Sequence, residues 1–598
     1  MTNSEIAKIL REVGEYLDMQ GEAFKPRAYE KAAENIASLD EGVEEIYAKG
    51  GLKAVEAIPS VGASIGGKIE ELLKTGKLKY YEQLKKKTPV ELSSLTAIEG
   101  LGPKSIKILY EKLGIKNVDE LERAAKAGEI ARLAGFGKKS EENILKGIGF
   151  ARSSGGRFLL GEALPMVRGI VEKIRKMKGV ERAEIAGSLR RYKETIGDGD
   201  ILAISDNPKP VMDFFVSMPE VADISAHGET KSAVKLKNGL DVDLRVLPKE
   251  SYGAALAYFT GSKDHNVHLR QMAIKKGYKL SEHGLFEKIK NQKSKIKNSD
   301  KNEKIIKAED GEWRQIAGKT EEEIYEKLGL RYIPPEMREM TGEVEAALQN
   351  KLPELIGYGD LKGDLQVQTS WTDGSNTIEE MARAAIEAGL EYIVITDHTK
   401  RLAMTGGLDE KRIQKQWEEI DAENEKLKIK NKKFRILKGS ECDILKDGTL
   451  DLPDEILEKL DVVGASVHSF FNLPKKAQTA RIIKAMENKH VDIIFHPTGR
   501  LINARPAYEA DMDEIIAAAR ATKTVLEIDA FPDRLDLCDG HIRKCVEAGV
   551  KMSIDSDAHA SHHFGVLEFG IAQARRGWVT REDIVNAWPV AKMLGMLK

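Results

Sequence analysis

The sequence predicts a multidomain chain of mixed α/β and α+β class, with an all-helical N-terminal part, a mixed middle part and a C-terminal distorted (β/α) barrel. Two observations support this prediction. Up to about residue 150, apolar residues recur at intervals of three and four, the period of amphipathic helices. From residue 360 on, short β-branched runs alternate with helical segments, which is typical of parallel strands in an α/β barrel.

Composition narrows the function classes. The 598 residues are 41% hydrophobic and 32% charged, with a formal net charge of −2. A near-neutral chain is not a uniformly basic nucleic-acid binder, so any DNA contact must come from local patches. Three cysteines give no disulfide framework, no apolar run reaches bilayer length, and the opening MTNSEIAKIL lacks a signal peptide's apolar core. We therefore expect a cytoplasmic protein without membrane contact.

Three similar segments in the helical part each place a hydrophobic–Gly pair between two helical runs. They are IPSVGASIGGKI (58–69), IEGLGPKSIKIL (98–109) and LAGFGKKSEENIL (133–145), with Gly62, Gly102 and Gly137 at the turns. Glycine permits the tight turn, and the amides that open the next helix then face outward. The unit resembles the helix-hairpin-helix, which binds a nucleic-acid backbone without reading bases, so three copies predict DNA binding.

Lys68, beside the first of these turns, is a candidate nucleophile. It lies one turn into the second helix of the unit, and Lys25 and Tyr29 lie in an earlier helical segment. A lysine with a lowered pKa can form a Schiff base with a sugar aldehyde, whereas an ordinary surface lysine is solvated and inert. The sequence leaves both roles open.

The stretch 185–202, IAGSLRRYKETIGDGDIL, predicts a phosphate and metal site. Backbone amides after the Gly187–Ser188 turn can seat a phosphate. Asp198 and Asp200 open an apolar run, and residues i and i+2 of a strand point to the same face. Both carboxylates can therefore meet one cation or an adjacent pair, as metal-assisted phosphoryl or nucleotidyl transfer requires.

A second strand-like run, LDVDLRVL (240–247), offers a third carboxylate. Its Asp241 and Asp243 alternate with apolar residues and share one face, so either can serve. After it comes the turn YFTGS (258–262), followed by a helix that bears Asn266 and Arg270.

With these motifs in order, residues 1–340 resemble a family X DNA polymerase of the DNA polymerase beta type, as found in bacteria and archaea. The resemblance rests on GSLRR–GDGD, DVDLRVLP, YFTGS and the hairpin-helix segments. It implies that Asp198, Asp200 and Asp243 bind two Mg²⁺ (or Mn²⁺) ions and that Asp243 helps to deprotonate or orient the primer 3′-hydroxyl. The implied nucleotide-binding residues are Gly187, Ser188, Arg191, Arg157, Tyr258, Phe259, Gly261 and Asn266.

The resemblance also assigns DNA contacts. Arg270 would contact the template side, and Lys68 matches the family's lyase nucleophile, with Lys25 and Tyr29 near a 5′-phosphate. Ser64 stands where the family commonly has a phosphate-binding lysine, which leaves lyase activity open. Residues 288–307 carry eight lysines against two acids, and this predicts either a solvated loop or a thumb insertion that follows the phosphate backbone.

In the second half, polar residues end the strand-like runs: Asp397, His398, Glu441, His468, His496, Asp557 and His559. Four histidines with carboxylates at strand ends predict a multinuclear metal site. This part is similar to the PHP (polymerase and histidinol phosphatase) domain, which hydrolyses phosphodiesters with two or three Zn²⁺ or Mn²⁺ ions. Asp373 and the residues above, apart from Asp397, match that family's ligands.

One departure concerns the first strand of this part. GDLQVQTSWTDG has Gln366 and Gln368 where the family has a His-x-His pair. A neutral amide is a poorer zinc ligand than imidazole. The sequence therefore predicts fewer than three ions, held by the clusters Asp373/His398/His559 and Glu441/His468/His496, and a weakened 3′→5′ exonuclease.

The expected domains are helix-hairpin-helix (1–90), fingers (91–155), nucleotidyltransferase palm (156–260), thumb (261–345), linker (346–359) and PHP (360–598). The leading hypothesis is a monomeric, gap-filling DNA polymerase of base excision repair that acts on gapped or primer–template DNA with dNTPs. A second makes the C-terminal domain the active part, as a phosphodiesterase or abasic-site nuclease. A third is a non-catalytic DNA-binding scaffold, against which the intact aspartate triad argues.

Overall fold

Two units make up the structure, a computed structural model that describes all residues except 2, 23, 38, 40, 41, 97, 99, 100, 154–156, 290–304, 309, 310, 431 and 432. One unit comprises Met1–Gly155 with Asn503–Pro506, and the other comprises Gly156–Ile502 with Ala507–Lys598. Most of the predicted lysine-rich segment 288–307 lies outside the described residues. No helix in the described part of the chain is long and apolar enough to cross a membrane.

The first unit is helical, as predicted. Its helices are α1 (Asn3–Gln20), α2 (Lys25–Ala37), α3 (Val43–Glu56), α4 (Ala63–Thr75), α5 (Lys79–Lys87), α6 (Leu92–Thr96), α7 (Pro103–Leu113), α8 (Val118–Lys126) and α9 (Lys138–Ser153). Ile6, Leu10, Val13 and Leu17 follow the helical period along α1 and are buried in the core of this unit. The predicted turn glycines directly precede α4, α7 and α9.

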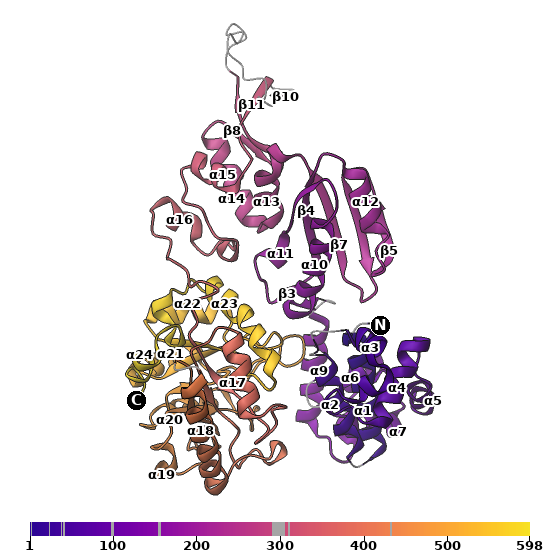
Figure 1. The fold of residues 1–598 in the computed structure, drawn as a ribbon, viewed down its shortest axis with the longest axis vertical. Helices are drawn as coiled ribbons and strands as arrows, with labels where there is room; N and C mark the ends of the chain where they lie inside the picture. Colours follow the sequence, from indigo (N-terminus) through magenta and orange to yellow (C-terminus); the bar gives the residue numbers. More distant parts are fainter. Residues whose placement is uncertain are drawn as a thin grey trace. The chain divides into compact units, whose positions relative to one another are not determined.

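The second unit begins with a five-stranded sheet in the order β2-β4-β7-β6-β5, in which only β4 and β7 run parallel (Figure 1). Its elements are α10 (Leu160–Arg175), β2 (Val180–Ile185), α11 (Gly187–Arg190), β4 (Asp198–Ser205), α12 (Pro208–Val216), β5 (Val221–His227), β6 (Lys231–Leu236), β7 (Asp241–Leu247) and α13 (Tyr252–Thr260). Ile201 and Ala203 face a core with α10 and α12, whereas Leu202 and Ile204 face α13. Helices therefore cover both faces of the sheet. Because β4 and β7 run parallel, their acidic first residues lie at the same end of the sheet.

The next segment adds α14 (Lys263–Lys275), β8 (Tyr278–Ser281), β9 (Gly284–Lys288), β10 (Ile305–Ala308), β11 (Gly311–Ala317), α15 (Glu321–Leu328) and α16 (Glu343–Leu348). Its strands form a second sheet in the order β10-β11-β9-β8. The buried Glu321 carboxylate accepts hydrogen bonds from Arg190 (2.6 Å) and from the fully buried Arg338 (2.7 Å). This ion triad ties α11 to the segment that follows the sheet.

The C-terminal part is a parallel seven-stranded barrel, β12 to β18 in sequence order. The strands are β12 (Gly363–Val367), β13 (Tyr392–Ile395), β14 (Arg435–Asp443), β15 (Val462–Ser466), β16 (Ile493–Ile494), β17 (Val525–Asp529) and β18 (Met552–Asp555). Between them run α17 (Ile378–Glu387), α18 (Glu410–Lys430), α20 (Lys475–Met486), α21 (Met512–Thr522) and α22 (Asp539–Ala548), and α23 (Leu567–Arg576) follows (Figure 1). A bridge between Val367 and Ala558 brings the first and last strands together, so the barrel is nearly closed.

Candidate active sites

The first site is a cleft of about 460 Å³ in the second unit, beside the start of β4. All eight residues predicted to bind the nucleotide line it, together with Asp198, Asp200 and Arg270. Gly197 and Lys263 also line it, although the sequence analysis did not single them out. Lys263 directly follows the YFTGS turn, so its position in the chain was the available signal.

The three predicted catalytic aspartates lie on adjacent strands. Because β4 and β7 pair in parallel register, Asp200 lies opposite Asp243 and Asp198 lies opposite Asp241. The Asp243 carboxylate is 3.0 Å from the Lys231 ammonium, a partner that the sequence analysis missed. Asp241 instead pairs with Lys235 at 2.9 Å and is largely exposed.

Of the two aspartates on β7, Asp243 acts more strongly on the charge of Asp200 than Asp241 does. Burial, reinforced by the negative charges of Asp198 and Asp243, raises the pKa of Asp200 to about 6. A divalent cation would relieve this repulsion and would find carboxylate oxygens, its preferred ligands. The donor set therefore fits a divalent metal ion.

The Gly-Ser turn depends on its glycine. Gly187 has φ = +64°, and a Cβ built there would lie 2.2 Å from Asp200 Oδ2. The turn thus packs directly against the carboxylate, which places the proposed phosphate and metal positions side by side.

Protein acceptors hold the polar side chains of the cleft. Arg191 Nε lies 3.0 Å from Glu339 Oε1, and Arg157 Nε donates to Thr195 Oγ1 at 2.9 Å. Asn266 Nδ2 donates to the backbone oxygen of Tyr258, and the Tyr258 and Phe259 rings meet edge to face with centroids 5.1 Å apart. One hydrogen bond and one ring contact therefore join Asn266, Tyr258 and Phe259.

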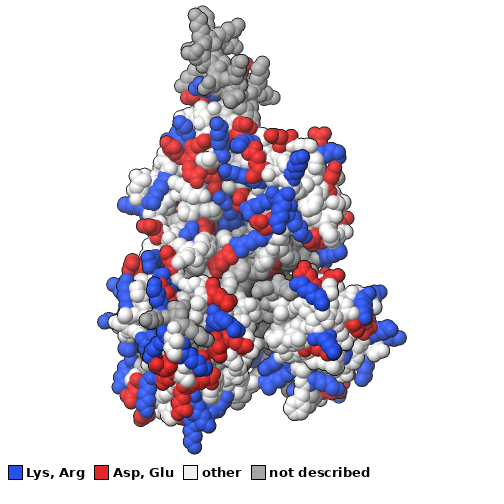
Figure 2. All heavy atoms as spheres, in the orientation of Figure 1, with Lys and Arg blue, Asp and Glu red and all other residues white. Residues whose placement is uncertain are grey.

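The cleft is lined by more basic than acidic residues, although the chain as a whole is nearly neutral. Its lining includes four basic residues, Arg157, Arg191, Lys263 and Arg270, against two acids. Figure 2 shows Lys and Arg gathered over the region where Figure 1 places β4, α11 and α13, whereas the rest of that face mixes both signs. A basic surface beside the cleft favours phosphate backbones.

In the first unit, Lys68 lies near two tyrosines. Its ammonium donates to the backbone oxygen of Ser64 at 3.0 Å and to Ser64 Oγ at 3.1 Å, and it lies 5.1 Å from the Tyr80 ring centroid and 5.8 Å from that of Tyr29. Lys25, at the start of α2, pairs with Glu22 at 2.9 Å. The structure thus brings Lys68 and Tyr29 together, and Ser64 holds the lysine.

The hairpin glycines have room around them. A Cβ added at Gly62, Gly102 or Gly137 would meet no described atom within 4 Å, and none of the three has positive φ. Packing within the described chain therefore does not call for glycine there. An outside backbone that approaches the helix starts closely would call for it.

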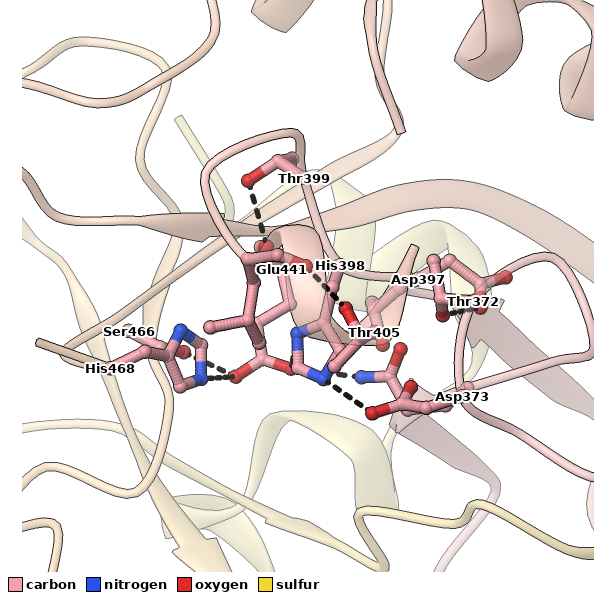
Figure 3. A network of polar contacts seen from close by, with 12 residues as sticks. Thr372, Asp373, Asp397, His398, Thr399, Thr405, Glu441, Ser466 and His468 are labelled. Carbon is pink, nitrogen blue, oxygen red and sulfur yellow. Dashed lines mark hydrogen bonds and ion pairs between the residues drawn. The ribbon is translucent and has the colours of Figure 1, made fainter. Parts of the chain in front are cut away.

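The second site lies at the C-terminal ends of the barrel strands. Two groups of three among the described residues have ligand atoms that all lie within 4.8 Å of one another: Asp373, His398 and His559, and His398, Glu441 and His468. Figure 3 shows Glu441 between His398 and His468, with Asp373 on the other side of His398. The predicted cluster had His496 in place of His398; His496 Nε2 lies 2.9 Å from Glu441 Oε1, beside the second group.

Attraction between acids and imidazoles dominates this site. Burial alone would lower the pKa of His468, but Glu441 and Asp443 raise it to about 9. Against the same effect of burial, Asp557 and Asp373 raise the pKa of His559 to about 10. Carboxylates and imidazoles held this closely match the donor set that Zn²⁺ and Mn²⁺ use. Asp397 lies apart from both groups and accepts hydrogen bonds from Thr369 and Gln416.

The position of Gln366 and Gln368 fits a metal ion less well. Both side chains are fully buried; Gln368 Nε2 donates to Glu441 Oε2 at 2.8 Å, whereas neither amide atom of Gln366 has a hydrogen-bond partner in the described structure. Arg534 Nε lies 3.8 Å from Asp557 Oδ2 and supplies a fixed positive charge there. Neutral amides and a guanidinium thus occupy the surroundings of the expected third ion.

Comparison with known proteins shows the family to which the chain belongs. Family models match residues 1–78 (helix-hairpin-helix domain), 92–149 (SAM-like helix-hairpin-helix tandem), 255–339 (DNA polymerase beta thumb) and 364–535 (PHP domain). The chain is 37% identical over 601 residues to the DNA polymerase/3'-5' exonuclease PolX of Bacillus subtilis (strain 168), with 100% of both chains covered. The chain belongs to the PolX family of DNA polymerases. The predicted family and fold class are confirmed.

The C-terminal part has relatives of its own. It is 33% identical over 233 residues to a probable phosphatase of Thermoanaerobacter sp. (strain X514), an alignment that covers 37% of this chain and 88% of that protein. A probable phosphatase of Acetivibrio thermocellus is 31% identical over 198 residues, or 32% of this chain and 76% of that protein. These relatives are similar to the PHP domain alone.

Proposed function

We propose that this family X DNA polymerase fills gaps in DNA by transferring a nucleotide from a dNTP to a primer 3′-hydroxyl. One observation carries the proposal: the Gly-Ser turn, Arg157, Arg191, the Tyr258–Phe259 pair and Asn266 line one cleft beside Asp198 and Asp200. Phosphate-binding, base-contacting and metal-binding groups therefore surround one nucleotide-sized space.

Asp198, Asp200 and Asp243 would hold two Mg²⁺ ions, which supply charge stabilisation for the attacking and leaving oxygens of an in-line displacement. The chain's own residues do the positioning. The Gly187–Ser188 turn, Arg191 and Arg157 would bind the triphosphate, Phe259 and Gly261 would pack against the sugar, and Asn266 would contact the base edge. Asp243 would accept the proton of the primer 3′-hydroxyl or orient that group.

The free glycines before α4, α7 and α9 support DNA-backbone binding by the first unit, with Arg270 on the template side. The lyase site, Lys68 with Lys25 and Tyr29, stays a prediction. Ser64 stands where the family commonly has a phosphate-binding lysine, and its hydroxyl accepts a hydrogen bond from Lys68. A repair role, a cytoplasmic location and a monomeric state likewise stay predictions.

For the PHP domain we propose metal-dependent 3′→5′ phosphodiester hydrolysis with two Zn²⁺ or Mn²⁺ ions. The two acid–histidine groups support it, and the name of the Bacillus subtilis relative includes such an activity. The amides at Gln366 and Gln368 favour a weakened hydrolase without the third ion.

Paired variants test the assignment of the two activities. Asp198→Ala with Asp200→Ala should abolish primer extension and spare primer shortening, whereas His468→Ala with His496→Ala should do the opposite. Both reactions are read on one gapped, end-labelled duplex, with and without dNTP. Asp241→Ala is the matched control, because this exposed aspartate lies on the same strand as Asp243 and should cost extension at most about twofold. Extension that survives loss of both cleft aspartates would refute the polymerase site.

A further inference from the structure

The loop after the Gly-Ser turn is bonded to the PHP domain at three positions. The backbone oxygen of Arg191 accepts a hydrogen bond from Arg576 Nη1 at 2.8 Å. The Tyr192 hydroxyl donates to Glu568 Oε1 at 2.7 Å, and Glu194 accepts from Arg500 Nη2 at 2.8 Å. Residues far apart in sequence thus hold the loop that carries a candidate triphosphate-binding arginine.

Apolar packing supports the same contact. Leu535 and Phe569 of the PHP domain belong to the buried core of the five-stranded sheet. A Cβ at Gly161, on α10, would lie 2.4 Å from Pro532 Cβ, so the two surfaces meet closely. Polar bonds at such a packed contact are shielded from water and therefore strengthened.

Arg576, on α23, is the central residue of this contact. Its side chain is 3% exposed, and Nη2 donates to Asp539 Oδ2 at 2.6 Å, which fixes it within the PHP domain. Its Nη1 also lies 3.1 Å from Glu339 Oε1, the same oxygen that Arg191 Nε approaches at 3.0 Å. Arg576 and Arg191 therefore share one carboxylate.

We propose that Arg576 is a positioning residue of the polymerase site, which acts from the PHP domain by fixing the Arg191 backbone and sharing the charge of Glu339. Without it, Glu339 keeps Arg191 as its nearest cation and competes with a triphosphate for that guanidinium. The released carbonyl also loosens the turn from Gly187 to Arg191. This inference rests on the proposed dNTP site, and it gives the PHP domain a part in polymerisation that is independent of its metal ligands.

The test compares Arg576→Gln, Arg576→Lys and a matched control, Arg575→Ala. Arg575 is the preceding residue on α23 and bonds Glu336 at 2.7 Å and the Ile356 backbone, but in the described structure it forms no hydrogen bond or ion pair with the loop 187–194. The full-length chain is used throughout. Single-nucleotide gap filling gives KM for dNTP and kcat, and hydrogen–deuterium exchange of the peptide spanning 187–194 reports the loop without any need for turnover.

For Arg576→Gln we expect KM for dNTP to rise about tenfold with kcat changed less than about threefold, and amide exchange in 187–194 to accelerate. Arg576→Lys, which keeps the charge, should recover part of both effects, and Arg575→Ala should leave both within about twofold. Unchanged exchange and KM in Arg576→Gln would overturn the proposal, as would equal effects of Arg575→Ala, which would show general domain docking. If wild type incorporates no dNTP, the polymerase assignment fails, while the exchange comparison still decides whether Arg576 holds the loop.

Discussion

Asp200→Asn is expected to abolish nucleotide incorporation and yet stabilise the metal-free protein. Incorporation should fall at least about 10³-fold, because the variant loses a carboxylate that is proposed to hold the metal ions. The free energy of unfolding should rise, because Asp200 is a partly buried, desolvated carboxylate with Asp198 and Asp243 beside it. We expect this combination, lower activity with higher stability, wherever a metal-binding carboxylate is destabilised by burial and by like charges.

The pH dependence follows from the raised pKa of Asp200, about 6 against an ordinary 3.8. A carboxyl with a raised pKa binds its proton more tightly in the folded state, so ionisation destabilises the fold as pH rises from about 4 to 6. Above pH 6 the cost is complete, on the order of 3 kcal/mol. Asparagine does not titrate, so the Tm advantage of the variant should be full at pH 7.5 and vanish near pH 4.

Thermal unfolding in a chelator across this pH range measures the effect, and titration with Mg²⁺ extends it. Mg²⁺ should raise the Tm of the wild type more than that of Asp200→Asn. Asp241→Asn is the control, since this exposed aspartate pairs with Lys235 and should leave incorporation and the pH profile almost unchanged. A variant less stable than wild type at pH 7.5 would contradict the electrostatic description of the site.

Restoring imidazoles in the barrel should restore a metal ion. In the double variant Gln366→His, Gln368→His we expect one additional bound ion per chain and primer shortening at least about tenfold faster. Neither amide atom of Gln366 has a described hydrogen-bond partner, so its replacement breaks no such bond, and removal of Gln368 frees Glu441 Oε2 for the ion.

Metal stoichiometry after dialysis against Zn²⁺ or Mn²⁺, and primer shortening without dNTP, give the two readouts. Each single variant supplies one imidazole and should fall between wild type and the double variant. Arg534 near Asp557 opposes the added cation, so Arg534→Gln in the double variant should strengthen its binding. Three ions already bound to the wild type would contradict the idea that the glutamines remove a site.

Local patterns predicted much of the grouping of residues at the two candidate sites. The i, i+2 spacing placed Asp198 and Asp200 on one strand face, and the parallel β4–β7 register then set Asp243 beside Asp200. Likewise, strand-end histidines had to gather at one rim of a parallel barrel. Period and spacing suffice where neighbouring strands bring residues together.

Contacts across hundreds of residues were not predictable in this way. No local pattern links Arg576 to Arg191 or Arg534 to Asp557, because both pairs depend on how whole domains and loops pack. Spacing alone also left Asp241 and Asp243 equivalent, since both share a strand face; the family resemblance favoured Asp243, and in the structure their lysine partners and burial differ. The structure therefore added long-range contacts and charge pairs, which sequence periodicity does not predict.

Primer extension on a duplex with a single-nucleotide gap, in Mg²⁺ and with one complementary dNTP, tests the central claim most directly. We predict addition of one templated nucleotide by wild type and none by Asp198→Ala with Asp200→Ala. Gap binding without incorporation by the wild type in either Mg²⁺ or Mn²⁺ would contradict the claim and would leave a DNA-binding scaffold as the better description.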